Sequence, residues 1–409
     1  MSYFQYKNSK LFAEKYSISN IVKNIKTPFY LYSEKQLIEN FLNFKKNFKN
    51  VNPLICYSVK SNSNPSILRI LGKLGSGADV VSEGELLKTL NSGIKSNKIV
   101  FSGVGKTEEE LKLAIKKRIL LINIESESEA KLINTLSKRM GKKTSIGIRL
   151  NPNVDAKTNE KISTGKAENK FGLSSKNLIN FCNNIHNLKY LKLDAISVHI
   201  GSQILSDKPY KKTLDIISNI IKENKLTLKF VDLGGGFGIS YKNKDKKIKL
   251  TNYSKLVNKF KKNLNCNIIF EPGRSIVGNT SMLISKIQYI KKSLKKQFII
   301  LDVGMNDFMR PALYDAEHNI IPVKKINKKI KGPIEFVGPI CESTCKFIKY
   351  NRYQKISEND FVAITKTGAY GSSLSSNYNT RPLIAEIMVS KNKLTIIRKR
   401  QDLSKLIKI

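Results

Sequence analysis

The feature that most constrains this chain is a regular alternation of short apolar runs and helix-like segments from about residue 50 to residue 278. Eight runs are apolar almost throughout, which is typical of strands buried on both faces of a parallel sheet. They are Leu54–Val59, Ala78–Val81, Lys98–Phe101, Leu120–Ile124, Ile146–Leu150, Asp194–Val198, Phe230–Leu233 and Asn267–Phe270. Eight strands that alternate with helices predict an α/β fold, a closed (β/α)8 barrel.

The expected helix starts support this alternation. Asn64 and Pro65 supply an N-cap followed by proline at the first helical position. Three candidate capping boxes, each directly after an expected strand, are Ser82/Glu85, Thr107/Glu110 and Ser126/Glu129. An open doubly wound sheet is the alternative, but the turn at Tyr57–Asn62 contains none of the glycines that a dinucleotide-binding turn requires.

After about residue 278 strand-like runs dominate, which predicts a second, all-β domain. The runs are Met282–Tyr289, Phe298–Val303, Ile320–Val323, Ile334–Val337, Phe361–Thr365, Leu383–Val389 and Leu394–Arg398. The early run Phe29–Tyr32 is expected to add an N-terminal strand to this domain. We therefore predict a barrel domain at residues 36–278 and a β-sheet domain made of residues 1–35 and 279–409.

Length, apolar runs and cysteines limit the functional class. A chain of 409 residues can bury a sizeable core. No apolar run reaches the roughly 18 residues of a membrane span, and Met1–Tyr6 lacks the cationic start and apolar block of a signal peptide. The five scattered cysteines make no disulfide framework. We expect a cytoplasmic protein without a membrane partner.

A formal net charge of +41 at first sight favours a nucleic-acid partner. Lysine is, however, spread along the whole chain together with abundant asparagine and isoleucine, a pattern typical of AT-rich codon use. No aromatic residues interleave with the lysine-rich tracts as base-stacking platforms would. We predict no nucleic-acid partner and treat the charge as a background that attracts anionic molecules.

Polar groups and glycines follow several of the expected strands, at the barrel end where catalytic residues gather. Lys60 follows the first strand, where an amine can form a Schiff base with an aldehyde. Gly234–Gly236 follows the seventh strand, where backbone N–H groups can converge on a phosphate. Taken singly, the lysine is better explained as a solvated side chain, and the glycines are equally well explained as a plain tight turn.

The sixth and eighth strands add an imidazole and a carboxylate–guanidinium pair. Glu271 could keep a heteroaromatic nitrogen protonated, Gly273 allows close approach, and Arg274 can grip a phosphate or carboxylate in a two-pronged contact. His199 is placed to stack on a flat cofactor, and no acid or cysteine stands at ligand spacing from a histidine. The combination predicts a site for a phosphate-bearing aldehyde cofactor and no metal site.

With these motifs in this order, the chain resembles the fold-type III pyridoxal-phosphate decarboxylases, most closely the branch that acts on meso-2,6-diaminopimelate. Further matching segments are Tyr57–Asn62, Gly77–Ser82, Glu168–Gly172, His199–Gln203, Met305–Tyr314, Gly338–Ser343, Gly368–Gly371 and Ser376–Asn379. The resemblance covers nearly the whole chain. It implies decarboxylation of meso-2,6-diaminopimelate to L-lysine and CO₂, the last step of lysine biosynthesis, with pyridoxal 5′-phosphate as the cofactor.

The resemblance also implies roles for individual residues. Lys60 would carry the cofactor, His199 would stack on its ring, and Cys341 would donate a proton. The cofactor would be held by Lys60, His199, Ser202, Gly235, Gly236, Glu271, Gly273, Arg274 and Tyr370. The substrate would be held by Arg274, Arg310, Tyr314, Glu342 and Tyr370. Cys341 and Glu342 would come from a partner subunit, so the implied assembly is a homodimer with shared active sites.

Two departures from the family pattern leave local loop shape open: Ser343–Lys346 replaces the usual Ser-Gly-Asp, and Lys366-Thr367 replaces the frequent Asp-Ala. The main alternative is an ornithine- or arginine-type decarboxylase, or an alanine racemase, on the same fold. A substrate tail that ends in a lone ammonium would face Arg310, and like charges about 4 Å apart cost about 4 kcal/mol at an effective dielectric near 20. A further alternative, a non-enzymatic pyridoxal-phosphate carrier, has a barrel without the extra domain.

Overall fold

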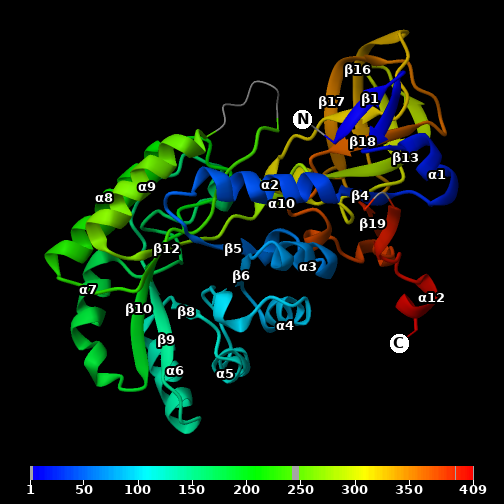
Figure 1. Ribbon diagram of the computed structural model, residues 1–409. Coiled ribbons are helices and arrows are strands. Elements are labelled where there is room, and N and C mark those ends of the chain that lie inside the picture. Colours follow the sequence, from blue (N-terminus) through cyan, green and yellow to red (C-terminus); the bar gives the residue numbers. More distant parts are fainter. Residues whose placement is uncertain (1–2, 242–247, 392, 409) are drawn as a thin grey trace. The chain divides into compact units, whose positions relative to one another are not determined.

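The computed structural model describes residues 3–241, 248–391 and 393–408, and the chain divides into two compact units (Figure 1). The barrel unit is built from the described residues of Phe41–Ile239 and Lys246–Ser275. The β unit is built from the described residues of Met1–Asn40, Ser240–Asp245 and Ile276–Ile409. One boundary between the units falls within helix α2 (Glu34–Asn47).

The described part of the barrel unit contains eight strands that pair in parallel and in chain order, and the last strand pairs with the first. Ile269 pairs with Leu54, and Phe270 with Ile55, to close the ring. The strands are β5 (Leu54–Ser58), β6 (Gly77–Val80), β7 (Ile99–Phe101), β8 (Leu121–Ile124), β9 (Thr144–Arg149), β10 (Leu191–Ser197), β11 (Phe230–Asp232) and β12 (Asn267–Phe270). The predicted closed barrel is confirmed.

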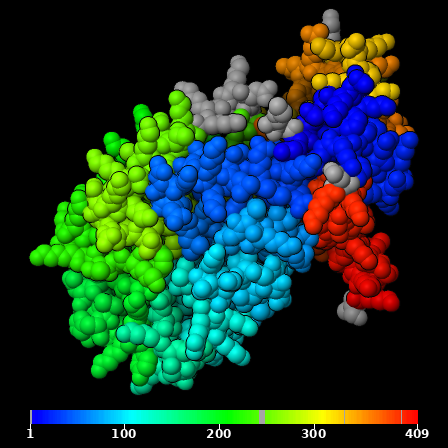
Figure 2. Space-filling model, viewed as in Figure 1, coloured from blue at the N-terminus to red at the C-terminus, as the bar shows by residue number. Residues whose placement is uncertain are grey.

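Helices cover the outside of this barrel (Figure 1), because each has one apolar face to bury. They are α3 (Pro65–Lys73), α4 (Glu83–Asn91), α5 (Glu108–Lys117), α6 (Glu127–Arg139), α7 (Ser175–Asn184), α8 (Lys208–Glu223) and α9 (Leu250–Leu264), while the short α10 (Arg274–Val277) follows β12. In α3 the buried side chains are Ile67, Leu68 and Leu71, the expected spacing for one helical face. Helices α3 to α6 follow one another around the barrel and form a continuous surface in Figure 2.

Two helix starts have the expected caps. The Asn64 side chain accepts a hydrogen bond from the Ser66 amide, with Pro65 at the first helical position of α3. At α5, Thr107 and Glu110 each accept the other's backbone N–H, at 3.2 Å and 2.8 Å, which is a complete capping box. These caps fix the first residues of the helices that follow strands β5 and β7.

The reciprocal half of the predicted capping box is wrong at α4 and α6. Their N-cap serines accept the expected amide, but the glutamates reach one residue further back. Glu85 accepts the N–H of Val81 at 2.9 Å, and Glu129 accepts the N–H of Glu125 at 2.8 Å. Glu129 is also held by Lys106, whose Nζ lies 2.6 Å from its carboxylate.

The β unit contains a nine-stranded sheet with the path β17-β16-β14-β13-β4-β19-β20, while β18 pairs with β13 and β15. The N-terminal strand β4 (Phe29–Ser33) lies between β13 and β19, which confirms the predicted contribution of Phe29–Tyr32. The other strands are β13 (Ser281–Lys292), β14 (Gln297–Leu301), β15 (Ile320–Pro322), β16 (Lys329–Val337), β17 (Lys346–Gln354), β18 (Phe361–Thr365), β19 (Ala385–Ser390) and β20 (Lys393–Arg398). Strand β17 was not expected from the sequence.

Smaller elements complete the β unit. A three-stranded sheet is formed by β1 (Phe4–Lys7), β2 (Lys10–Ala13) and β3 (Tyr16–Ser17), followed by α1 (Ile18–Asn24). Two short helices are α11 (Arg310–Tyr314) and α12 (Leu403–Leu406). Among the helices that the structure describes, none is both long and apolar enough to cross a membrane.

Candidate active site

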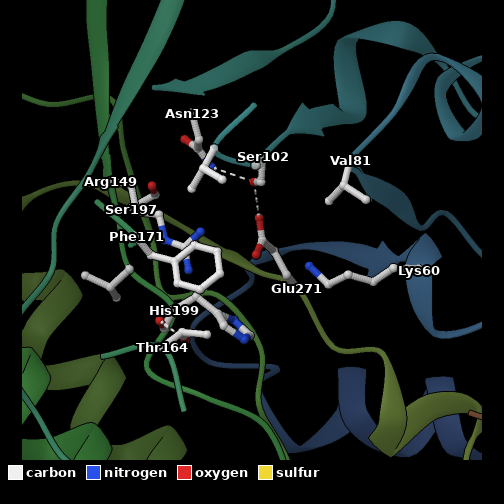
Figure 3. A pocket seen from close by; sticks show the side chains of 13 residues that line it. Lys60, Val81, Ser102, Asn123, Arg149, Thr164, Phe171, Ser197, His199 and Glu271 are labelled. Atoms are coloured by element: carbon white, nitrogen blue, oxygen red, sulfur yellow. Dashed lines mark hydrogen bonds between the residues drawn. The ribbon is translucent and has the colours of Figure 1, made fainter. Parts of the chain in front are cut away.

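A pocket of about 350 Å³ lies at the carboxyl ends of the barrel strands (Figure 3). Its lining consists of Lys60, Val81, Ser102, Gly103, Val104, Asn123, Arg149, Thr164, Phe171, Ser197, Val198, His199 and Glu271. Three residues expected from the sequence, Lys60, His199 and Glu271, therefore line one cavity. In the described part of the chain, no group of three or more His, Cys, Asp or Glu side chains could hold a metal ion.

Lys60 lies in the single 3₁₀ turn Val59–Ser61 that follows β5, and its side chain is 36% exposed. Its Nζ lies 3.2 Å from Oδ2 of Asp79, a fully buried residue of strand β6. The same oxygen accepts a hydrogen bond from Ser58 at 2.8 Å. Asp79 thus directs the lysine at the pocket, and the sequence analysis missed it. Its only sequence signal is an acid within an apolar run.

A chain of buried polar groups connects Glu271 with strands from the other side of the barrel. Ser102 Oγ donates to Oε1 of Glu271 at 3.5 Å, and Asn123 Nδ2 donates to Ser102 Oγ at 3.2 Å. Asn123 Nδ2 is also 3.2 Å from Oδ2 of Asp232. The dashed lines in Figure 3 mark the first two contacts. Glu271 is therefore held in place by a network that the sequence analysis did not identify.

The pKa values of the two acids in this network are raised by their surroundings. Burial raises the pKa of Glu271 well above its usual value, and the charges of Asp232 and Asp79 add to the effect while Lys60 opposes it. Burial also raises the pKa of Asp232 to about 6, although hydrogen bonds offset part of that rise. The two carboxyl groups are hydrogen-bonded to each other, which lowers the pKa of Asp232 and raises that of Glu271.

His199 lies just beyond β10 and is held at both backbone and ring. Its carbonyl accepts a hydrogen bond from Thr164 Oγ1 at 2.6 Å, and its Nδ1 accepts the N–H of Gly235 at 3.3 Å. The pKa of His199 lies well below its usual value, because burial penalises the charged ring and because Lys60 and Arg149 repel a third cation. The imidazole is therefore neutral, with its proton on Nε2.

The glycine loop after β11 is built for close backbone approach. A Cβ on Gly235 would lie 2.1 Å from the carbonyl oxygen of Glu271, and one on Gly236, whose φ is +87°, would lie 2.3 Å from that of Gly201. The Tyr210 hydroxyl donates a hydrogen bond to the carbonyl oxygen of Gly235 at 2.9 Å and so holds the loop in place. Only glycine fits at these two positions. A loop whose backbone can be approached this closely suits a bound phosphate.

Arg274 and Ser202 lie together, as a phosphate site would require. Nη2 of Arg274 donates to Oγ of Ser202 at 2.9 Å, and the arginine is 5% exposed. A Cβ on Gly273 would lie 3.0 Å from Ser61, so the Glu271–Arg274 segment packs closely on the turn that carries Lys60. Cofactor and substrate residues expected from separate loops of the barrel unit are thus neighbours.

Arg149 and Glu125 form an ion pair that holds one wall of the pocket in place, and the sequence analysis did not identify it. Arg149 Nη1 donates to Glu125 at 2.7 Å, and the other oxygen of Glu125 accepts the N–H of Gly172 at 2.7 Å. The Arg149 guanidinium also lies 4.6 Å from the centre of the Phe171 ring. These contacts tie the segment before α7 to the ends of strands β8 and β9.

The other expected site residues belong to the β unit. Arg310 and Tyr314 begin and end α11, and Arg310 is 5% exposed. Cys341 and Glu342 lie in the exposed turn between β16 and β17. Tyr370 follows β18 with φ of +54°, a left-handed conformation that is uncommon for a bulky residue and is typical of functional loops.

The exposed turn between β16 and β17 is ordered by its own side chains. The carboxylate of Glu342 accepts hydrogen bonds from the Tyr378 hydroxyl and, at 3.1 Å, from Thr344. Cys345, which departs from the family pattern, is buried, and its Sγ accepts the N–H of Met305 at 3.3 Å. The departure therefore places a thiol in the core and leaves Cys341 and Glu342 at the surface of the turn.

Glu85 at the start of α4 provides a test of the electrostatics near the pocket. Burial raises its pKa to about 7, although the Val81 N–H lowers it. Between pH about 4.5 and 7 the folded protein holds a proton that the unfolded chain has lost, so the free energy of unfolding falls as pH rises. In Glu85→Gln the free energy of unfolding should fall by about 2 kcal/mol less between pH 5 and pH 8 than in the unsubstituted protein. Urea unfolding at the two pH values would measure this difference.

The matched control for this experiment is Glu109→Gln, since Glu109 is exposed on the neighbouring helix α5. This variant should keep the pH dependence of the starting protein. An unchanged slope in Glu85→Gln would mean that Glu85 titrates normally in the folded state.

Lys60, His199 and Glu271 meet in one pocket at the carboxyl ends of the barrel strands, next to a glycine loop, and this arrangement is what a pyridoxal-phosphate enzyme requires. Residues 34–278 match the family described as "Pyridoxal-dependent decarboxylase, pyridoxal binding domain". The chain belongs to this family of pyridoxal-dependent decarboxylases. Its cofactor is pyridoxal 5′-phosphate.

Curated relatives and solved structures agree with this assignment. The chain is 43% identical over 394 residues to diaminopimelate decarboxylase of Helicobacter pylori strain J99, covering 96% of this chain and 97% of the relative. It is 40% identical over 404 residues to that of Aquifex aeolicus, covering 98% and 95%. The crystal structure of the Helicobacter pylori enzyme complexed with L-lysine has a TM-score of 0.91 at 42% identity, covering 95% of this chain and 98% of that one.

Proposed function

We propose that this protein decarboxylates meso-2,6-diaminopimelate to L-lysine and CO₂, as the last step of lysine biosynthesis. The observation that carries the proposal is the pocket in which Lys60, His199 and Glu271 meet. This pocket lies in a chain that is about 40% identical, over nearly its full length, to diaminopimelate decarboxylases. The pocket supports the chemistry, and the relatives support the choice of substrate.

The barrel unit supplies the residues that would hold the cofactor. Lys60 would attach it covalently, with Asp79 orienting the amine. The neutral ring of His199 would pack on the flat face of the cofactor. A charged His199 ring would be repelled by Lys60 and Arg149. The phosphate would be bound by Ser202, Gly235, Gly236, Gly273 and Arg274, and Tyr370 would also contact the cofactor. When bound, the cofactor's protonated ring accepts the electron pair that the departing carboxyl group leaves.

Glu271 would hold the ring nitrogen of the cofactor in its protonated form. Glu271→Gln keeps the shape but removes the ionisable carboxyl group, so kcat should fall about 10²-fold while the cofactor stays attached. Steady-state kinetics and the visible absorbance of the protein would measure both effects. Glu127→Gln, on the exposed face of α6, is the matched control. A Glu271→Gln variant with unchanged kcat would exclude this role.

We also propose roles for the site residues of the β unit. Arg310, Tyr314 and Tyr370, together with Arg274, would bind the distal carboxylate of the substrate, and Glu342 its distal ammonium. Cys341 would donate the proton that replaces CO₂, and its exposure in a surface turn suits delivery to a partner subunit. The proposed assembly is a homodimer with shared sites, and the five free cysteines are consistent with a cytoplasmic location.

The test is product analysis. Purified protein supplied with pyridoxal 5′-phosphate should convert meso-2,6-diaminopimelate into L-lysine and CO₂, and should not release a diamine from ornithine or lysine or agmatine from arginine. Release of a diamine or agmatine, without L-lysine, would instead assign the protein to the decarboxylases of other basic amino acids.

A further inference from the structure

We propose that His318 is a positioning residue that aims the guanidinium of Arg310 at the distal carboxylate of the substrate. The inference rests on the proposed function, in which Arg310 binds that carboxylate. His318 was not among the expected site residues, and the reaction as described does not use it. It is 2% exposed and lies between α11 and β15 in the β unit.

The hydrogen bonds of His318 fix which ring nitrogen carries the proton. Its Nδ1 lies 2.8 Å from the carbonyl oxygen of Thr365. A carbonyl oxygen only accepts, so Nδ1 must be the donor and, in the neutral ring, Nε2 the acceptor. Nε2 lies 3.2 Å from Nε of Arg310, whose N–H donates to it. The strand β18 thereby determines, through the imidazole, where the guanidinium is held.

Aromatic rings hold both partners in this arrangement. The Tyr241 ring packs edge-on to the His318 ring at 4.8 Å between centres, and the Phe308 ring does so at 4.7 Å. The Arg310 guanidinium also lies 5.1 Å from the centre of the Tyr241 ring. A buried arginine loses rotamer freedom here before any ligand arrives, so less entropy remains to be lost on binding.

The direction of the Arg310 Nε–H determines how the guanidinium can meet a carboxylate. An arginine grips a carboxylate in two-pronged fashion either through Nε and one Nη or through both Nη atoms. With Nε–H directed at His318, the grip must use the two Nη groups. A core histidine that only filled space would impose no such orientation, because any ring of the same size would serve.

Three substitutions of His318 distinguish a positioning role from a space-filling role. In His318→Asn the short side chain keeps a donor for Thr365 but loses the acceptor that faces Arg310. We expect KM for meso-2,6-diaminopimelate to rise about tenfold with kcat changed less than twofold, because the contact binds substrate and transition state alike. His318→Gln, whose side-chain oxygen reaches the position of Nε2, should restore KM to within about threefold. His318→Leu, which fills space without an acceptor, should behave like His318→Asn.

A double-mutant cycle with Arg310→Ala tests whether His318 acts through the arginine. In the Arg310→Ala background, His318→Asn should change KM less than twofold. Tyr353→Phe is the matched control. Tyr353 is a buried aromatic residue of the nine-stranded sheet, and its hydroxyl donates a hydrogen bond to the carbonyl oxygen of Ile320. It should leave KM unchanged in both backgrounds.

The outcomes distinguish this inference from the proposed function. If the unsubstituted protein makes L-lysine but His318→Asn and His318→Leu leave KM unchanged, the positioning role is wrong and the proposed function stands. Equal effects in Gln, Asn and Leu variants would likewise overturn it in favour of a space-filling role. If the unsubstituted protein makes no L-lysine, both proposals fall. Should the Asn variant not fold, the comparison of Leu with Gln decides.

Discussion

Replacing Lys60 with alanine is expected to lower kcat for lysine formation by more than about 10³-fold and to leave the protein without covalently held cofactor. Lys60 is the amine that lines the pocket, with its Nζ held 3.2 Å from Asp79. Its loss removes the covalent attachment point that holds the cofactor in position, and positioning of a reacting group contributes a factor of at least this order. A change in KM without a fall in kcat would not agree with this prediction.

The measurement combines kinetics with trapping of the cofactor. Borohydride treatment of the unsubstituted protein should fix the cofactor to the peptide that contains Lys60, and in Lys60→Ala the reduced label should be absent. Lys88→Ala is the matched control, since Lys88 lies on α4 with its amine exposed and hydrogen-bonded to Ser63. A Lys60→Ala protein that still holds the label or forms L-lysine would overturn the assignment of the pocket.

The barrel could be predicted from the sequence because its strands are buried on both faces. Residues of strands such as β7 (Ile99–Phe101) and β8 (Leu121–Ile124) are buried throughout, so an apolar run is itself the signal. Strand β17 gave no such signal. In Lys346–Gln354 only Phe347 and Tyr353 are buried, and the residues between them are exposed or half-buried, so this edge strand has no continuous apolar run.

The site was predictable only where a chemically distinctive residue follows a strand. Lys60, His199 and Glu271 satisfy that condition and line one pocket. Asp232 and Asn123 are 109 residues apart, and only closure of the barrel makes them hydrogen-bond partners. No local pattern could report that contact. The glutamates at α4 and α6 were wrongly predicted for a different, local reason, because a long side chain can accept a hydrogen bond from either of two adjacent amides.

Replacing Arg310 with alanine is expected to reduce kcat/KM for meso-2,6-diaminopimelate on the order of 10³-fold, almost entirely through KM, while the cofactor stays bound. The guanidinium is 5% exposed and is held by His318 and Tyr241. Removing one partner of a desolvated charge pair costs 2–5 kcal/mol, which corresponds to this factor. The distal carboxylate does not react, so the contact is the same in the ground state and the transition state, and kcat should be preserved.

Substrate preference gives the sharper readout of this variant. In the proposed site a tail that ends in a lone ammonium would be repelled by Arg310. Removing Arg310 should therefore weaken discrimination against such amino acids even as it weakens binding of meso-2,6-diaminopimelate. Arg352→Ala is the matched control, since Arg352 is exposed on β17. Unchanged KM in Arg310→Ala would remove this residue from the substrate site. A large fall in kcat at constant KM would instead mean that Arg310 acts on the reacting end, because only a contact made in the transition state alone has that signature.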